Sequence, residues 1–208
     1  MDPRRLERFP LFPLALVILP GEAVPLHIFE ERFKLMIGRC LDSGGEFGIV
    51  WLGDDGLREV GCTARITRVL DQLEEGRMNI LVRGEHPFRL TRRIDDLPYP
   101  AGDVELLDDV EAGDEDAARQ AREHYAELVQ RVTEERPDLT TLASLDAYGM
   151  AATVEFGLDA KQGLLELRSE TSRLERLSEL FGSTIERIER AEASAEVART
   201  NGHLRRSP

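Results

Sequence analysis

Apolar and polar positions in the first hundred residues alternate mainly with the two-residue period of a β-strand. Met78, Ile80 and Val82 are separated by Asn79, Leu81 and Arg83, a pattern with one clearly apolar face. This strand, in "GRMNILVRGEHPFRL", is predicted to pair with "LREVGCTARITRVLDQL" across the loop "EEG", and "EFGIVWLG" supplies a further strand. Short strands with glycine turns at close intervals predict a compact antiparallel sheet or partly closed barrel.

The apolar run Phe9–Phe33 follows several arginines and raises the question of a secretory signal. A signal peptide needs an uninterrupted apolar core, and Pro10, Pro13 and Pro20 interrupt this one. Leu14–Leu19 reads instead as a buried strand that ends in the turn "PGE", and "AVPLHIF" is again extended. We therefore expect this segment to belong to the folded domain.

One early helix is predicted in "EERFKLMIGRCL", where the spacing of apolar residues changes to that of a helix. Glu30 and Glu31 stand at its start, where carboxylates favour the positive end of the helix dipole. We expect the helix to pack against the sheet through one face: Phe33, Met36, Ile37, Cys40 and Leu41.

Helical periodicity dominates the second half of the chain. A first helix ends before Pro137 and carries the stripe Ala118, Ala121, Tyr125, Leu128 and Val132. A second, less regular stretch is "LTTLASLDAYGMAATVEFGL". A third helix, "DAKQGLLELRSETSRLERLSELF", carries Leu164, Leu167, Leu174, Leu177 and Phe181. The remaining residues, from "TIERIERAEAS" to the end, are expected to extend a helix outward and then fray, because the apolar stripe thins there.

The acidic stretch from Asp103 to Asp116 separates these halves, with eight acids and no base. A calcium loop that began at Asp109 would place Gly113 where an acidic ligand belongs, so the motif fails. A solvated linker whose last acids favour the next helix start is the better interpretation. We accordingly predict a β-rich domain over residues 1–110 and an α-helical subdomain over residues 111–208, an α+β fold.

Charge narrows the classes of partner. The chain of 208 residues has a net charge of −13, with 14 basic and 20 acidic side chains in residues 1–110 and 13 and 20 in residues 111–208. Neither half offers the basic footprint that neutralises phosphates, so nucleic acid and anionic membranes are not expected partners. No apolar run approaches the roughly 20 residues of a membrane span. Cys40 and Cys62 read as small buried hydrophobes, consistent with a cytoplasmic protein.

Several of these segments, in order, resemble the amino-terminal domain of the Lon ATP-dependent protease. They are "FPLFPLALVILPGEAVPLHIFEERFKLMIGRCL", "EFGIVWL", "VGCTARITRV", "GRMNILVRGEHPFRL" and "KQGLLELRSETSRLERL". The resemblance implies a small PUA-like β fold, similar to one in cereblon, followed by a helical bundle. It also implies recognition of substrate proteins and assistance in assembly, with no chemistry attached, in a free-standing form of that domain.

The parts of a complete protease of this kind are not found in the sequence. A phosphate-binding loop needs a lysine followed by serine or threonine, but Lys34 is followed by Leu35 and Lys161 by Gln162. Neither lysine has a serine in a nucleophile-like context, as a Ser-Lys dyad would require. We therefore expect a chain that is not an enzyme.

Other candidate chemistry is equally sparse. The histidines lack metal-ligand spacing, and His27 reads as a strand residue with a satisfied ring; the four are His27, His86, His124 and His203. Trp51 reads as a core or rim aromatic, and Arg89, Arg92 and Arg93 as solvated strand residues. No catalytic, cofactor-binding or metal-binding residue is predicted, no cofactor is expected, and the peptide-binding residues stay unassigned.

The leading hypothesis is a non-catalytic module that binds unfolded or flexible protein segments through an apolar groove or an unpaired sheet edge. Three alternatives are an RNA-associated PUA-like binding protein, a hydrolase with an unrecognised site, and a self-assembly scaffold. The helical half makes a homo-oligomer plausible without requiring one.

Overall fold

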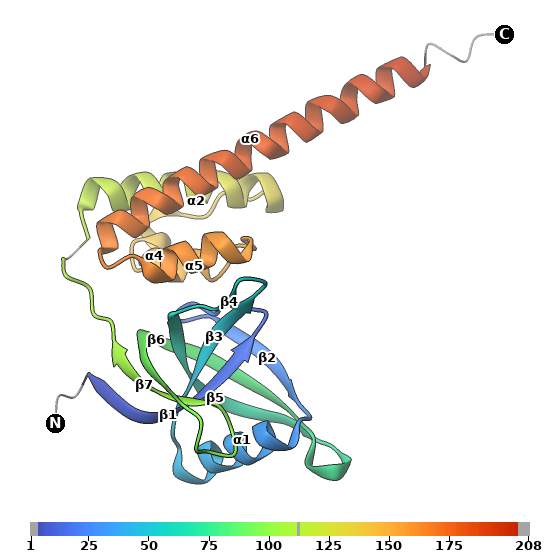
Figure 1. Cartoon of the computed structure of the whole chain (residues 1–208). Coiled ribbons are helices and arrows are strands. Elements are labelled where there is room, and N and C mark those ends of the chain that lie inside the picture. The colour runs from blue at the N-terminus through green and yellow to red at the C-terminus, as the bar shows by residue number, and fades with distance from the viewer. Residues whose placement is uncertain (1–3, 112, 204–208) are drawn as a thin grey trace. The chain divides into compact units, whose positions relative to one another are not determined.

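The computed structural model describes residues 4–111 and 113–203. Contacts divide the chain into two compact units, one of Met1–Glu111 with Tyr148–Ser169, the other of Ala112–Ala147 with Glu170–Pro208. The first unit holds the strands and the second is helical (Figure 1).

The sheet of the first unit curls back on itself. Its strands are β1 (Arg5–Leu14), β2 (Ala23–Ile28), β3 (Phe47–Gly53), β4 (Gly56–Leu57), β5 (Val60–Gln72), β6 (Met78–Ile94) and β7 (Ala101–Leu106). They follow the order β1-β7-β6-β5-β3-β4, and β1 also pairs with β3 in parallel, while β2 pairs with β6. The predicted α+β fold, with a partly closed β-barrel and a helical region after it, is confirmed.

Phe88 fills the interior of this barrel. It is fully buried and packs with Phe9, Leu11, Val50 and Val104. Close approach of the strands to its ring requires glycine, because a Cβ at Gly48 would lie 2.6 Å from the Phe88 ring. The aromatic ring and the glycine together set how tightly the strands close.

Helix α1 (Glu31–Ser43) packs on the barrel as predicted, with one difference. Its N-cap is Glu30, and Gly44 ends it in the left-handed conformation at φ 65°. Four of the five predicted stripe residues are buried, whereas Leu41 is 38% exposed because it lies at the edge of the stripe. The centroids of the Phe33 ring and the Phe12 ring of β1 lie 4.1 Å apart, and this contact anchors the helix.

The first strand starts earlier than the sequence predicted, and the prediction of a strand over Leu14–Leu19 is wrong. Strand β1 covers Arg5–Leu14 and contains Pro10 and Pro13, with a register shift between Leu6 and Phe9. A proline is tolerated in a strand where its nitrogen does not face a neighbouring acceptor. Residues 17–19 are buried without belonging to a strand.

The acidic stretch is partly structured, so the predicted linker over Asp103–Asp116 is too long. Strand β7 extends through Leu106, and Asp103 accepts hydrogen bonds from the Arg8 backbone N–H (3.0 Å) and the Arg92 side chain (2.8 Å). Asp114 caps the following helix by accepting from two backbone N–H groups, which confirms that the last acids support a helix start.

The remaining helices are α2 (Glu115–Thr133), α3 (Leu139–Leu142), α4 (Ala147–Ala151), α5 (Leu158–Glu166) and α6 (Glu170–His203), and a 3-10 turn, η1 (Glu74–Gly76), joins β5 to β6. The single helix predicted across Leu164–Phe181 is wrong, because Leu167 is extended at ψ 138° and separates α5 from α6. Val132, predicted in the buried stripe of α2, is 69% exposed.

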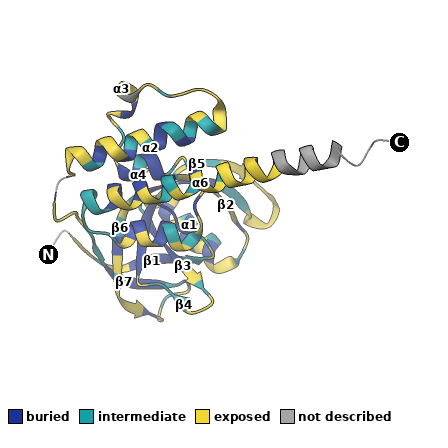
Figure 2. Ribbon diagram, turned by 90° about the horizontal axis from the view of Figure 1, so that it is seen from above, coloured by how far each residue is buried: buried dark blue, intermediate teal, exposed yellow. Residues whose placement is uncertain are grey.

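Helices α2 and α6 form the core of the second unit, where the ring centroids of Tyr125 and Phe181 lie 5.6 Å apart. The last buried side chain of α6 among the described residues is Ile185, and residues 186–195 are largely exposed (Figure 2). The fraying predicted for the very end of the chain falls on residues 204–208, which lie outside the described residues.

Helix α5 belongs to the strand-rich unit although it follows the acidic stretch. The Lys161 ammonium lies 2.5 Å from a carboxylate oxygen of Glu22, and Gln162 donates to the Val60 carbonyl at 3.2 Å. A parallel bridge between Glu111 and Ser169 places the two points at which the chain leaves this unit side by side. The strand-rich unit is thus built from two stretches of sequence, whereas the sequence prediction divided the chain once, at residue 110.

Within the described part of the chain, no helix is both long enough and apolar enough to cross a membrane.

Candidate recognition face

The outer side of a three-stranded ribbon is the most distinctive exposed surface of the first unit. Strand β6 is the middle strand, with β2 paired to Met78–Arg83 on one side and β5 paired to the same residues on the other. The buried side chains Ile80 and Val82 face the barrel, so Asn79, Leu81 and Arg83 face outward.

Two irregularities in β5 decide which of its side chains share this outer face. The register shifts between Ile66 and Arg68 and again between Val69 and Asp71. Each shift places one extra residue in β5 relative to β6, so the side-chain alternation of β5 restarts after it. The outward positions of β5 therefore recur at every third residue. We define the ribbon face by its outward residues and those just beyond the strand ends: Ala23, Pro25, His27, Phe29, Arg65, Arg68, Asp71, Leu73, Arg77, Asn79, Leu81 and Arg83.

Polar side chains connect the three strands of the ribbon face. His27 Nδ1 and Asn79 Oδ1 are 2.7 Å apart, and the Asn79 amide donates to Asp71 at 3.1 Å. The His27 ring stacks on Phe29 with 5.7 Å between centroids. The His27 ring is therefore satisfied, as the sequence predicted, and it also holds Phe29 in place.

Apolar side chains stand exposed at one end of the ribbon face. Phe29 is 58% exposed and Leu73 is 42% exposed. The Leu73 N–H donates to the Arg77 carbonyl at 2.8 Å, which continues the ladder one step past the end of β5. Single exposed apolar residues are common, but Phe29 and Leu73 follow the ends of two strands that pair with the same end of β6, and apolar side chains gathered in this way indicate a binding surface.

Arginines give the ribbon face a local charge opposite to that of the whole chain. Arg65 pairs with Glu46 at 2.6 Å and with Glu85 at 3.9 Å. The guanidinium groups of Arg68 and Arg83 have no hydrogen bond or ion pair within residues 4–111 and 113–203. Asp71 is the acid of this face, so its balance is basic in a chain of net charge −13.

The outer edge of β2 offers only part of a strand-pairing surface. The Gly84 N–H donates to the Glu22 carbonyl at 2.9 Å, so the backbone groups of alternate residues from Glu22 onward point toward β6. Those of Ala23, Pro25 and His27 consequently point to the open edge, where Pro25 lacks a donor. A proline in this position discourages edge-to-edge pairing.

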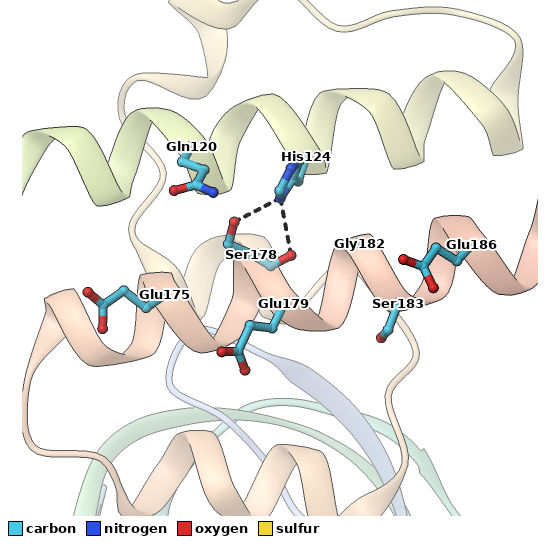
Figure 3. A pocket seen from close by; sticks show the side chains of 8 residues that line it. All are labelled: Gln120, His124, Glu175, Ser178, Glu179, Gly182, Ser183 and Glu186. Carbon is cyan, nitrogen blue, oxygen red and sulfur yellow. Dashed lines mark hydrogen bonds between the residues drawn. The ribbon is translucent and has the colours of Figure 1, made fainter.

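The helical unit contains a serine and a histidine within hydrogen-bonding distance. His124 Nδ1 lies 2.8 Å from Ser178 Oγ and 3.1 Å from the Ser178 carbonyl oxygen, between α2 and α6 (Figure 3). They border a hollow of about 550 Å³ lined by Gln120, His124, Glu175, Ser178, Glu179, Gly182, Ser183 and Glu186. Ser178 lies within a helix, whose backbone N–H groups are used in the helix and cannot form an oxyanion hole. The pair therefore joins two helices and is not arranged as a catalytic dyad.

The two lysines considered for chemistry each contact a carboxylate. Lys34 lies 2.7 Å from Glu31 and donates to the Glu75 carbonyl, and Lys161 pairs with Glu22. Each has an anionic partner rather than a serine, so neither is placed as the base of a Ser-Lys dyad.

The cysteines are buried and free, as predicted. Burial raises the pKa of both the Cys40 and the Cys62 thiols, which keeps them in the unreactive neutral form. Across the part of the chain that the structure describes, no group of three or more His, Cys, Asp or Glu side chains is arranged to hold a metal ion.

Residues 8–181 match the family model of the ATP-dependent protease La (LON) substrate-binding domain. The chain belongs to this family.

Curated relatives of the chain carry the name Lon protease. "Lon protease 1" of Syntrophobacter fumaroxidans is 26% identical over 204 residues, which cover 88% of this chain and 24% of that protein. "Lon protease" of Escherichia coli K12 is 26% identical over 211 residues, covering 91% of this chain and 26% of that protein. The chain thus spans about a quarter of the length of these Lon relatives.

Solved Lon amino-terminal domains share the fold. The Lon N-terminal domain protein from Xanthomonas campestris superposes with a TM-score of 0.63 at 23% identity, over 83% of this chain and 97% of that one. The N-terminal domain of Mycobacterium avium complex Lon protease gives 0.63 at 22% identity, over 85% and 98%.

Sequence reasoning missed most of the ribbon face of this Lon-family domain. The sequence predicts that His27 is a satisfied strand residue, and it places Phe29 only in an extended segment. The spacing of Arg65, Arg68 and Asp71 at every third position was the available signal. It is not a strand period, so it has meaning only once the two register shifts in β5 are known.

Proposed function

We propose that this Lon substrate-binding domain recognises exposed segments of partner proteins, and that the ribbon face binds them. The observation that carries the proposal is the pair of exposed apolar side chains, Phe29 and Leu73, at a fixed end of a face that also presents unpaired arginines. An unfolded segment offers apolar and acidic side chains that match such a surface.

Side-chain contacts are proposed to dominate over strand addition. The open edge of β2 has a gap in its donors at Pro25, so a partner strand cannot pair continuously along it. Phe29 is held by stacking on His27, so little conformational freedom is lost when a partner covers it. The chain itself is proposed to do no chemistry and to present the segment to other proteins.

Fluorescence anisotropy of labelled, unfolded casein titrated with the whole chain tests this proposal. Phe29→Ala and Leu73→Ala should each raise Kd by about tenfold, since losing roughly 1.4 kcal/mol of apolar burial corresponds to that factor. Leu41→Ala, at a 38% exposed position on α1, is the matched control and should bind like the unmodified chain. Equal affinity of all four proteins would remove the ribbon face from the proposal, and a concentration-dependent mass without casein binding would favour a scaffold.

Single-stranded RNA is a second candidate ligand of the same face. Arg68, Arg77 and Arg83 accompany an aromatic stack on an exposed sheet, a combination that suits backbone phosphates and bases. Titration of an unstructured RNA at two salt concentrations distinguishes the two. RNA affinity that falls steeply as salt rises, and that Arg68→Gln weakens, would support RNA as the ligand. Casein affinity that changes little with salt would support protein recognition.

A further inference from the structure

A hollow of the first unit lies at the start of β5 and uses no residue of the ribbon face. Its volume is about 500 Å³, and it is lined by Leu57, Arg58, Glu59, Val60, Arg89 and Glu166. Backbone hydrogen bonds fix this part of the chain, because the Arg58 N–H donates to the Trp51 carbonyl at 2.9 Å and the Leu90 N–H donates to the Glu59 carbonyl at 2.8 Å.

Arg58 is held in place without an anionic partner. Its guanidinium carbon lies 4.9 Å from the centroid of the Trp51 ring, a cation–π contact that fixes the side chain. Its Nε is buried and has no hydrogen-bond acceptor among the described residues. A buried donor without an acceptor is rare in folded proteins, because its lost hydration is not replaced. Arg58 also lines the hollow, so an acceptor from outside the chain can approach its guanidinium there.

Arg89 brings a second guanidinium to the same hollow. It faces Val60 across the β5–β6 ladder, and its guanidinium makes no ion pair within the described part of the chain. Two guanidinium groups at one hollow form the donor set that binds planar oxyanions, since each can donate two parallel N–H groups.

We propose that this hollow binds a single carboxylate carried by a peptide. Glu59 and Glu166 line it as well, and Glu166 is held there by the Gln162 amide at 2.7 Å. The two carboxylates balance the two guanidinium groups in formal charge, so the directed N–H donors must hold the ligand. A phosphate group with two charges would meet more repulsion from Glu59 and Glu166 than one carboxylate does. Leu57 and Val60 supply apolar walls for the carbon atoms beside the carboxylate. The carboxylate comes either from a chain terminus or from an acidic side chain.

The only tryptophan of the chain, Trp51, reports on this hollow because Arg58 lies on its ring. Three probes separate the sources: acetyl-Gly-Leu with a free carboxylate, acetyl-Asp-Leu amide, and acetyl-Gly-Leu amide. We expect a saturable change in Trp51 fluorescence with at least one of the two acids and none with the neutral amide. The acid that binds identifies the source.

Variants tie the signal to the arginines. Arg58→Gln and Arg89→Gln should each weaken binding of the acid about tenfold by calorimetry, which does not depend on the altered Trp51 environment. Arg58→Lys should also weaken it, because an ammonium cannot donate two parallel bonds. Arg93→Gln, at another exposed arginine of β6, is the control and should bind as the unmodified chain does.

Two results would overturn the proposal: equal responses to the acid and the amide, or unchanged affinity in both glutamine variants. Far-ultraviolet circular dichroism checks that each variant is folded. If Arg58→Gln fails to fold, Arg89→Gln still tests the proposal, because Arg89 is exposed and its replacement leaves the core unchanged. Casein binding that is lost in Phe29→Ala while dipeptide binding persists would show that the two sites act independently.

Discussion

At the scale of single residues, the ion pair between Lys161 and Glu22 joins positions 139 apart in sequence. The two side chains are only 9% and 13% exposed, and Glu22 also accepts from the Leu19 N–H at 3.0 Å. Lys161→Met should lower the free energy of unfolding by about 3 kcal/mol, because it leaves a buried carboxylate without its cation. Urea denaturation measures the loss.

The double variant Lys161→Met with Glu22→Gln is the control for this charge effect. It should recover part of the lost stability, since no buried charge is then left unpaired. If the single and double variants were equally unstable, packing around Lys161 rather than its charge would account for the loss.

Asp103 gives a second prediction at the residue scale. Hydrogen bonds from the Arg8 backbone N–H and the Arg92 side chain hold the pKa of Asp103 below its ordinary value. A carboxylate with a depressed folded pKa contributes stability above its unfolded pKa, about 3.9, and loses that contribution as pH falls through the folded pKa. Asp103→Asn should therefore be less stable than the unmodified chain at pH 7, by a margin that shrinks below about pH 4.

Urea midpoints at pH 7 and pH 3 test this difference. Asp54→Asn, in the exposed turn after β3, is the matched control and should show no such trend. A gap for Asp103→Asn that is as wide at pH 3 as at pH 7 would contradict the role of the ionised carboxylate.

At the scale of elements, β2 is an edge strand with a proline in its middle. Pro25→Thr would restore an N–H on the open edge and complete the row of donors there. We expect greater self-association at high protein concentration, measured by light scattering, with little change in the urea midpoint. Ala23→Thr adds the same side chain where a donor already exists and should leave the scattering unchanged. Equal scattering from both variants would mean that Pro25 does not prevent self-association through the open edge of β2.

Elements with a simple period were predictable from the sequence, and those set by distant contacts were not. Alternation in Met78–Val82 gave β6, and the stripe of α1 was correct except at Leu41. The break at Leu167 and the early start of β1 were missed, because each depends on pairing or packing with remote residues. The ribbon face was missed for the same reason, since its arginines align only after the register shifts of β5.

At the scale of the whole molecule, the strand-rich unit includes α5 as well as residues 4–111. A chain that ends at Glu111 lacks Lys161 and Gln162 and leaves Glu22 without its partner. We expect this shortened chain to unfold at a much lower urea concentration than the full chain. Trp51 fluorescence follows the unfolding. A chain that ends at Ala195 keeps both contacts and should match the full chain. A cooperative transition at the same midpoint for the shortest chain would show that α5 is dispensable.

The chain crosses between its two units three times, after Glu111, Ala147 and Ser169. A single proteolytic nick at any one crossing leaves two intact peptide connections, so neither unit is released as a soluble fragment. Limited proteolysis should accordingly give nicked chains that stay together on a sizing column and separate only in denaturant. Recombination faces the same restriction, because exchanging one unit between related proteins requires three splice junctions instead of one.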